Sequence, residues 1–328
     1  MRFCLPFHIV LALCLTLLLA SCGGKKGSSG TPGQQAAIER RQFPSPPNVP
    51  SVLSDPVEIR GYVVTHFWDA FLDKYHSSDT TLVNGVPKDD VESALGRYVT
   101  LLENGCESKK AIETVSVFFR QVNDFQSANP ESNVFSFFEE MVPKYLYDPN
   151  SPVRDEDLYQ PYVQGLSESA FVPEELRLPY SRDSRMCSLN KKGTPAADIV
   201  FTDRGGKRRT LYGVKASHTL LFFSNPGCPA CEDLIGKLTG SDRINGKVKS
   251  GELAVVNLYI DLEVDKWRGM SGYYPSAWIN GYDQDYTIRK DLTYNVRAIP
   301  SLYVLDKDKK VVMKDAPVEK VIPYLENI

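Results

Sequence analysis

Two cysteines, Cys228 and Cys231, stand two residues apart in the stretch FFSNPGCPACEDL, directly after a run of apolar residues. Thiols at this spacing can close and reopen a disulfide between themselves, which would make them a redox couple. The same pair could supply half of a zinc site or form a small buried turn. A zinc site needs about four ligands, and the sequence has no second CxxC pair and only 4 histidines. We therefore favour redox chemistry and expect no metal.

The residues that follow predict a different role for each of the two thiols. The stretch PACEDLIGKLTG predicts a helix that begins at Cys228, where unpaired N–H groups and the helix dipole stabilise a thiolate. Only a thiolate attacks a disulfide, so Cys228 is the predicted attacking thiol, and Cys231 resolves the mixed disulfide. Ala230 brings no cation between them, and Glu232 and Asp233 add negative charge. This environment favours a reductase over a strong oxidant.

The surrounding elements predict an α/β domain over residues 191–328. Strands are predicted on both sides of the turn at 203–206, at 218–224, at 252–261, in AIPSLYVLD and in KKVVMKDA, and helices in PACEDLIGKLTG, DYTIRKDLTYNV and VEKVIPYLENI. This order is typical of a mixed sheet that is covered by helices on both faces. Pro300 follows Ile299 at the mouth of a predicted strand. Proline is disfavoured in the middle of a sheet, so we expect a special loop there.

Residues 55–180 predict an all-α domain. Asp55 is a typical helix N-cap, with Pro56 at the first helical position. Apolar residues, many of them aromatic, recur at helical spacing in five stretches, and no strand-like alternation interrupts them. The segment shows no catalytic constellation, so we expect it to dock a partner or a second copy of the chain. A connector, 181–190, joins it to the α/β domain.

The N-terminus predicts export. Arg2 and the apolar stretch at 9–20 form a secretory signal over residues 1–21, too short for a comfortable membrane span. Its ending, LASC, resembles the bacterial lipobox, and the lipidated cysteine would be Cys22. A plain signal peptide and an uncleaved anchor are the alternatives. Residues 22–54 are rich in Gly, Ser and Pro and predict a flexible tether. We expect a lipid anchor in the bacterial cell envelope, with the redox domain in the periplasm.

Export determines which cysteines remain to form disulfides. Of the 7 cysteines, two leave with the signal peptide and Cys22 carries the lipid, so four remain in an oxidising compartment. The two-residue spacing pairs Cys228 with Cys231. Cys106 and Cys187 then form either a second, structural disulfide or two unpaired thiols.

Residues 191–328 resemble the thioredoxin superfamily, nearest the periplasmic thiol-disulfide oxidoreductases of the TlpA/ResA kind. The matching pieces are GTPAADIVFTDRGGKRRTL, the apolar strand before CPAC, LYID and AIPSLYVLD. The resemblance implies that Cys228 attacks, that Cys231 resolves, and that a cis Ile299–Pro300 bond faces them and holds an extended substrate. It also implies protein thiol or disulfide partners, an upstream electron donor or acceptor, and no cofactor. The whole layout resembles lipoproteins of Bacteroidetes with a helical domain of unknown function before such a module.

The sequence departs from this family in two ways. Gly227 stands before the first cysteine, where an aromatic residue is usual. The buried acid that many thioredoxins carry on the preceding strand is missing from TLLFF, so water or Glu232 would have to assist resolution. Trp267, Tyr273 and Tyr274 either line the substrate groove or pack in the core.

Other functions fit the sequence less well. Haem attachment requires a histidine after the second cysteine, where this chain has Glu232. Thiol peroxidases share the fold but carry a Thr-x-x-Cys pattern, and Asn225 occupies the Thr position here. A lipid-anchored binding protein with structural cysteines is the alternative from another class. A net charge of −3 gives no basic excess for binding nucleic acid.

Overall fold

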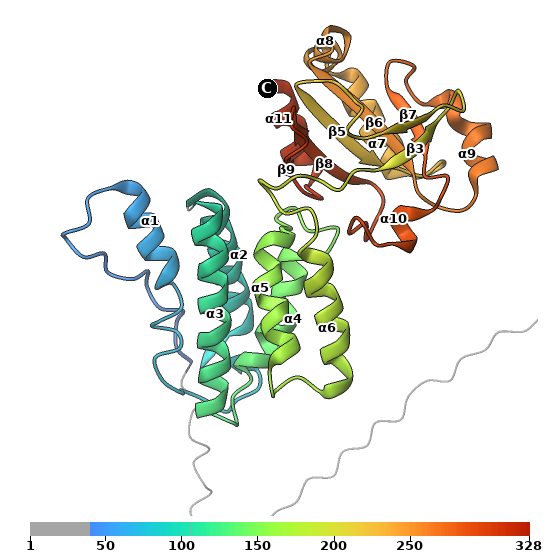
Figure 1. Cartoon of the computed structure of the whole chain (residues 1–328). Coiled ribbons are helices and arrows are strands. Elements are labelled where there is room, and N and C mark those ends of the chain that lie inside the picture. Colours follow the sequence, from blue (N-terminus) through green and yellow to red (C-terminus); the bar gives the residue numbers. More distant parts are fainter. Residues whose placement is uncertain (1–39, 106) are drawn as a thin grey trace, which may run out of the picture. The chain divides into compact units, whose positions relative to one another are not determined.

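The computed structural model describes residues 40–105 and 107–328 (Figure 1). The predicted signal peptide at 1–21, Cys22, Cys106 and the first part of the tether lie outside the described residues. Residues Ile38–Ile328 cluster into one unit, in which helices precede a mixed sheet. In the ranges described, no helix is long and apolar enough to cross a membrane.

The N-terminal half of this unit is helical. Its elements are α1 (Pro56–Thr65), β1 (Leu82–Val83), β2 (Val86–Pro87), α2 (Lys88–Gly105), α3 (Ser108–Ala128), α4 (Val134–Leu146), α5 (Glu156–Glu168) and α6 (Glu174–Cys187). Asp55 caps α1 as expected, because its carboxylate accepts the N–H groups of Val57 and Glu58. The predicted helical domain is therefore present.

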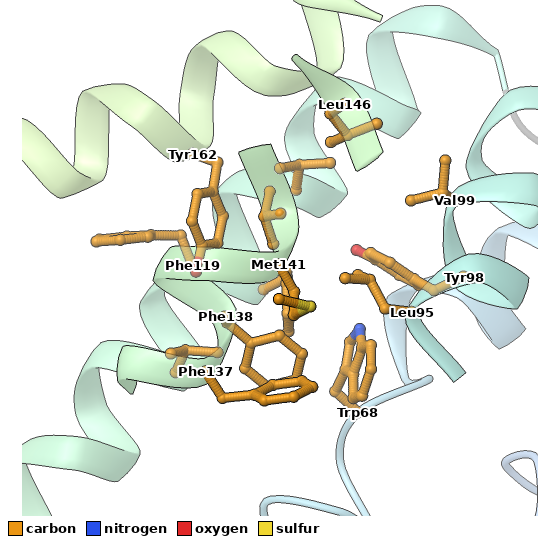
Figure 2. Close-up of a cluster of buried hydrophobic side chains, with 14 of the residues drawn as sticks. Trp68, Leu95, Tyr98, Val99, Phe119, Phe137, Phe138, Met141, Leu146 and Tyr162 are labelled. Atoms are coloured by element: carbon orange, nitrogen blue, oxygen red, sulfur yellow. The ribbon is translucent and has the colours of Figure 1, made fainter. Parts of the chain in front are cut away.

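Aromatic side chains fill the core of the helical domain and point toward one another (Figure 2). Trp68 lies near the centre: its ring stacks on Phe118 and meets Phe138 edge-on, both at a centroid distance of 5.0 Å. Such pairs add to the free energy that burial of the rings already contributes. The aromatic periodicity of the sequence is thus explained by packing.

Three features of the helical domain differ from expectation. α1 ends at Thr65, and tight turns then carry Trp68 and Phe71 into the core. β1 and β2 form a hairpin around Asn84 and Gly85, whose positive φ angles of 47° and 81° suit a two-residue turn. Its strands are too short to show alternation. The unpredicted helix α6 occupies most of the expected connector, and its mainly polar sequence buries only residues near its C-terminus.

The C-terminal half is built on a seven-stranded mixed sheet with the order β4-β3-β7-β6-β5-β8-β9. Its strands are β3 (Val200–Asp203), β4 (Arg208–Thr210), β5 (His218–Phe223), β6 (Leu253–Tyr259), β7 (Ile279–Tyr282), β8 (Ser301–Asp306) and β9 (Val311–Met313). Its helices are α7 (Pro229–Gly240), α8 (Asp242–Ser250), α9 (Val264–Met270), α10 (Thr287–Lys290) and α11 (Val318–Asn327), with a 3₁₀ turn at Ser271–Tyr273.

Strand β5 lies inside this sheet, parallel to β6 and antiparallel to β8. Leu220 and Phe222 face one buried cluster, and Leu221 and Phe223 face another. A strand buried on both faces reads as a continuous apolar run, which explains the sequence HTLLFF.

Three elements of this half, α8, α9 and β7, were not predicted from the sequence. A long helix was expected in DYTIRKDLTYNV, but only four of these residues are helical, in α10.

A buried ionic cluster links α5 to the segment that follows β9. The Lys314 ammonium lies 3.2 Å from Oε2 of Glu156 and 3.4 Å from Oδ1 of Asp157, and it donates a hydrogen bond to the carbonyl of Cys187. The side chains of Lys314, Glu156 and Asp157 are 2%, 1% and 4% exposed. Burial raises the pKa of Glu156 to about 7, and the charges of Lys314 and Arg297 oppose this rise. Each charge in this cluster therefore depends on its partners.

Gly165 lets α5 approach α3 closely. A Cβ atom at this position would overlap a ring carbon of Phe119. Gly165→Ala should lower the free energy of unfolding by about 1–3 kcal/mol. The matched control is Gly246→Ala in α8, where a Cβ meets nothing within 4 Å and should raise stability by about 0.5–1 kcal/mol. Urea unfolding of both variants would contradict this packing if their midpoints shifted in the same direction.

Lys314→Met keeps the length of the side chain and removes its charge, which leaves two buried carboxylates without this cation. We expect the free energy of unfolding to fall by about 3 kcal/mol. Because the folded-state pKa of Glu156 lies above the ordinary 4.5, near 7, this carboxyl weakens the fold as pH rises between those values. Loss of the Lys314 charge should raise this pKa further, so the deficit of the variant relative to wild type should grow as pH rises above about 7, where Glu156 ionises in the wild-type protein.

The control for this experiment is Lys237→Met. Lys237 pairs with Asp233 at 2.7 Å, but the two side chains are 49% and 65% exposed, so the midpoint of unfolding should stay close to the wild-type value. Equal losses in the two lysine variants would show that the buried cluster contributes no more than a surface pair.

Candidate active site

Cys228 is the N-cap of α7. Its backbone is extended (φ −86°, ψ 111°), and its sulfur accepts the N–H of Cys231 at 3.3 Å. Pro229 occupies the first helical position, which suits a residue without an N–H group. The sulfur is half-buried, so a partner can reach it. The predicted location at a helix start is confirmed.

Cys231 lies behind it. Its side chain is 1% exposed and packs in the apolar cluster under α7. Burial, followed by its contact with Cys228, raises the pKa of Cys231 to about 12. Cys231 is therefore a protonated thiol near neutral pH, while Cys228 is the more accessible of the two. Both are free thiols in this structure.

The proline loop faces this pair. The Ile299–Pro300 peptide bond is cis, as expected. The Cys228 sulfur lies 3.9 Å from the carbonyl oxygen of Ile299. The loop enters β8 at Ser301, which pairs with Phe223 at the end of β5. Sheet register thus brings the loop and the cysteines to the same edge.

Three polar residues brace the loop before Cys228, a role that the sequence did not indicate. Asn225 donates its side-chain N–H to Asp261 at 2.8 Å, and Asp261 pairs with Arg289 at 3.1 Å. Arg289 also donates to the carbonyl of Val296, ahead of the proline loop. The stretch LYID could have indicated Asp261, which follows β6. The C-terminal ends of β5 and β6 meet at one edge of the sheet, so Asp261 lies near the cysteine loop.

A cavity of about 360 Å³ opens beside Cys231. Tyr273 and Tyr274 line it, and the first is 83% exposed while the second is 6% exposed. Trp267 packs in a buried aromatic cluster with Tyr274. Of the three aromatic residues considered from the sequence, Tyr273 and Tyr274 therefore border the cavity and Trp267 belongs to the core.

Two departures from the usual motif have structural counterparts. Gly227 has a φ of 72°, a left-handed conformation that an aromatic side chain would rarely adopt. Leu220 and Phe222 of β5 pack in the same buried cluster as Cys231, so apolar side chains stand on the face of this strand where the acid is usual. Glu232 is exposed, so it does not replace a buried acid.

The pairing of Cys106 with Cys187 and the lipidation of Cys22 stay predictions. Cys187 is a fully buried free thiol at the end of α6, and burial raises its pKa. Its expected partner, Cys106, lies outside the described residues, as does Cys22. Across residues 40–105 and 107–328, no cluster of three or more His, Cys, Asp or Glu side chains is arranged to hold a metal ion.

The sequence matches the model of a protein family described as Domain of unknown function (DUF5106) over residues 21–186. This match covers just over half of the 328 residues. No curated protein matches the chain.

Solved structures extend the comparison to the rest of the chain. A thioredoxin-like protein from Bacteroides caccae is 31% identical, with a TM-score of 0.73, over 86% of this chain and 97% of that one. The C-terminal domain of an uncharacterized protein from Bacteroides fragilis is 43% identical over 42% of this chain and 97% of its own, with a TM-score of 0.40. A domain of a possible thiol-disulfide isomerase from Cytophaga hutchinsonii is 28% identical over 43% and 94%, with a TM-score of 0.38. The first match includes both domains and confirms the expected fold class.

The different environments of the two thiols predict different reactivity. Near neutral pH, iodoacetamide should alkylate Cys228 and leave Cys231 unmodified. In a Cys228→Ser variant, alkylation of Cys231 should become rapid only as the pH approaches its pKa of about 12, because the thiolate is the reactive form. Mass spectrometry of alkylated peptides measures both rates. Preferential modification of Cys231 at neutral pH would reverse the assigned roles.

Proposed function

Because the chain belongs to the DUF5106 family and to the thioredoxin-like proteins, we propose that it is a thiol-disulfide oxidoreductase acting on other proteins. The observation that carries the proposal is the geometry of the pair: a half-buried Cys228 at a helix N-terminus faces the cis-proline loop, with a buried Cys231 behind it. This arrangement exposes one sulfur to a partner and keeps the other for the second step.

The proposed reaction proceeds in two exchanges. The Cys228 thiolate attacks a disulfide of the partner, which forms a mixed disulfide and releases one partner thiolate, and this thiolate takes up a proton from water. Cys231 then attacks the sulfur of Cys228, and its proton passes to the departing second thiolate. The partner gains two electrons and two protons, and this protein retains the Cys228–Cys231 disulfide.

The direction that we propose is reduction. Ala230 brings no cation between the cysteines, and Glu232 and Asp233 follow them, so the thiolate form lacks the added stabilisation of a positive neighbour. Turnover then requires an upstream dithiol protein, which reduces the Cys228–Cys231 disulfide and is itself oxidised.

We further propose that the protein is anchored in the cell envelope through lipid on Cys22, with the redox domain in the periplasm. The apolar stretch at 9–20 and the ending LASC support this location. Arg41 and Phe43 of the expected tether pack against the helical domain, so only the part before Arg41 would let the folded part reach its partners. Self-association through the helical domain is part of the same proposal.

Cys231→Ala should trap partners. Without the resolving thiol, the mixed disulfide on Cys228 persists, because the second exchange cannot occur. Partners should be captured from envelope extracts and released by dithiothreitol. The Cys228→Ala/Cys231→Ala double variant is the control and should capture none. Retention of wild-type disulfide exchange by the trap variant, with no captured protein, would refute the assigned roles.

The same preparations separate the proposed activity from its main rival. Wild-type protein should exchange disulfides with a peptide and consume hydrogen peroxide slowly. Rapid peroxide turnover in the absence of disulfide substrates would instead identify a thiol peroxidase.

A further inference from the structure

Two polar side chains flank the cis-proline loop, and one buried carboxylate binds both. Arg297 precedes Ile299–Pro300 and donates from Nη2 to Oδ2 of Asp315 at 2.9 Å. Ser301 follows the loop and donates from Oγ to Oδ1 of the same residue at 2.7 Å. The Asp315 side chain is 6% exposed, so water competes little for these bonds. Asp315 therefore ties the two ends of the loop together.

The helical domain binds the same guanidinium. Nε of Arg297 donates to Oε1 of Glu156 at 2.9 Å, and the guanidinium lies 4.0 Å from the ring centroid of Tyr147. Asn295 adds a 2.7 Å hydrogen bond to the same Glu156 oxygen. A guanidinium can bind two carboxylates at once because its donors form a rigid planar fork. Arg297 thus connects the first residue of α5 to Asp315.

Asp315 has a second anchor in the helical domain. Nε of Arg154, just before α5, donates to the Asp315 carbonyl at 2.8 Å. The φ angle of Asp315 is 40°, in a region that residues with a side chain seldom occupy. Such a conformation persists where surrounding contacts over-determine it, which occurs often at functional sites.

We propose that Glu156, Arg297, Asp315 and Ser301, here called the loop clamp, position the Ile299–Pro300 loop for the partner's polypeptide. The inference rests on the proposed disulfide exchange. The helical domain then acts on the reaction without touching the sulfurs: it holds Arg297, and Arg297 and Asp315 hold the loop whose Ile299 carbonyl faces Cys228.

Positioning of this kind affects a protein substrate more than a small reagent. An extended partner has to pair with the loop while its disulfide meets Cys228, so a small displacement of the loop lowers the fraction of productive encounters. Iodoacetamide requires only access to the sulfur. The two reagents therefore separate a positioning role from a general loss of structure.

The test compares Glu156→Gln and Arg297→Lys in the full chain. Glutamine keeps the shape of Glu156 without its charge, and lysine keeps the charge of Arg297 without the fork. With a peptide carrying one internal disulfide and dithiothreitol as reductant, each variant should lose about tenfold in kcat/KM, mainly through KM. The rate of Cys228 alkylation and the reduction potential of the pair should remain at wild-type values.

The matched control is Lys320→Met. Lys320 of α11 pairs with Glu103 of α2 at 2.6 Å, so this variant removes another ion pair between the two halves and leaves the loop clamp intact. Its kcat/KM should change by less than about twofold, because a single partly exposed pair contributes little.

A double-mutant cycle between Glu156→Gln and Ser301→Ala adds an independent readout. The two residues share no contact but meet through Arg297 and Asp315, so their effects on kcat/KM should be less than additive. Additive effects, a loss in Glu156→Gln no larger than in Lys320→Met, or a parallel loss of alkylation rate would overturn the positioning role. Absence of exchange by the wild-type protein would remove the proposed function, and the positioning role with it.

Discussion

Charge balance in a buried interface is the constraint on which this structure depends. Three acids and three bases meet where α5 begins and the chain leaves β9, and none of their side chains is more than 12% exposed. They are Glu156, Asp157, Asp315, Arg154, Arg297 and Lys314. Removing such ions from water is costly, and only mutual pairing with good geometry offsets the cost. The two halves of the chain therefore supply charges that neither half could bury alone.

The redox site places two thiol groups in different environments. Cys228 receives an N–H at a helix end and remains accessible, whereas Cys231 is enclosed by apolar side chains. Burial disfavours the charged form of a thiol, and a donor N–H favours it. In the proposed reaction, this difference within one turn of helix sets the order of the two exchange steps. The supporting brace from Asp261 and Arg289 keeps that turn near the proline loop.

Features encoded by neighbouring residues could be predicted from the sequence. The helix start at Cys228, the buried strand HTLLFF and the aromatic helical core each have a local signature, whereas the cis bond at Pro300 was implied by the family resemblance. Polar α6 and the short hairpin at Asn84–Gly85 lacked enough apolar periodicity to be recognised. The pairing of Glu156 with Arg297 spans 141 residues, and no local pattern indicates which acid will meet which base. Contacts of this kind are decided by tertiary packing alone.

The residues between the cysteines have a consequence for how this protein can change over evolutionary time. Pro229 and Ala230 are exposed, while the sheet register that sets the loops opposite each other is fixed by the pairing of Phe223 with Ser301. Substitution at the two exposed positions alters the surroundings of the sulfurs and leaves the ladder of strands untouched. Mutations can therefore change the reduction potential of the cysteine pair without changing the stability of the fold. Proteins that descend from a common ancestor with this fold can consequently work in compartments of different oxidising strength.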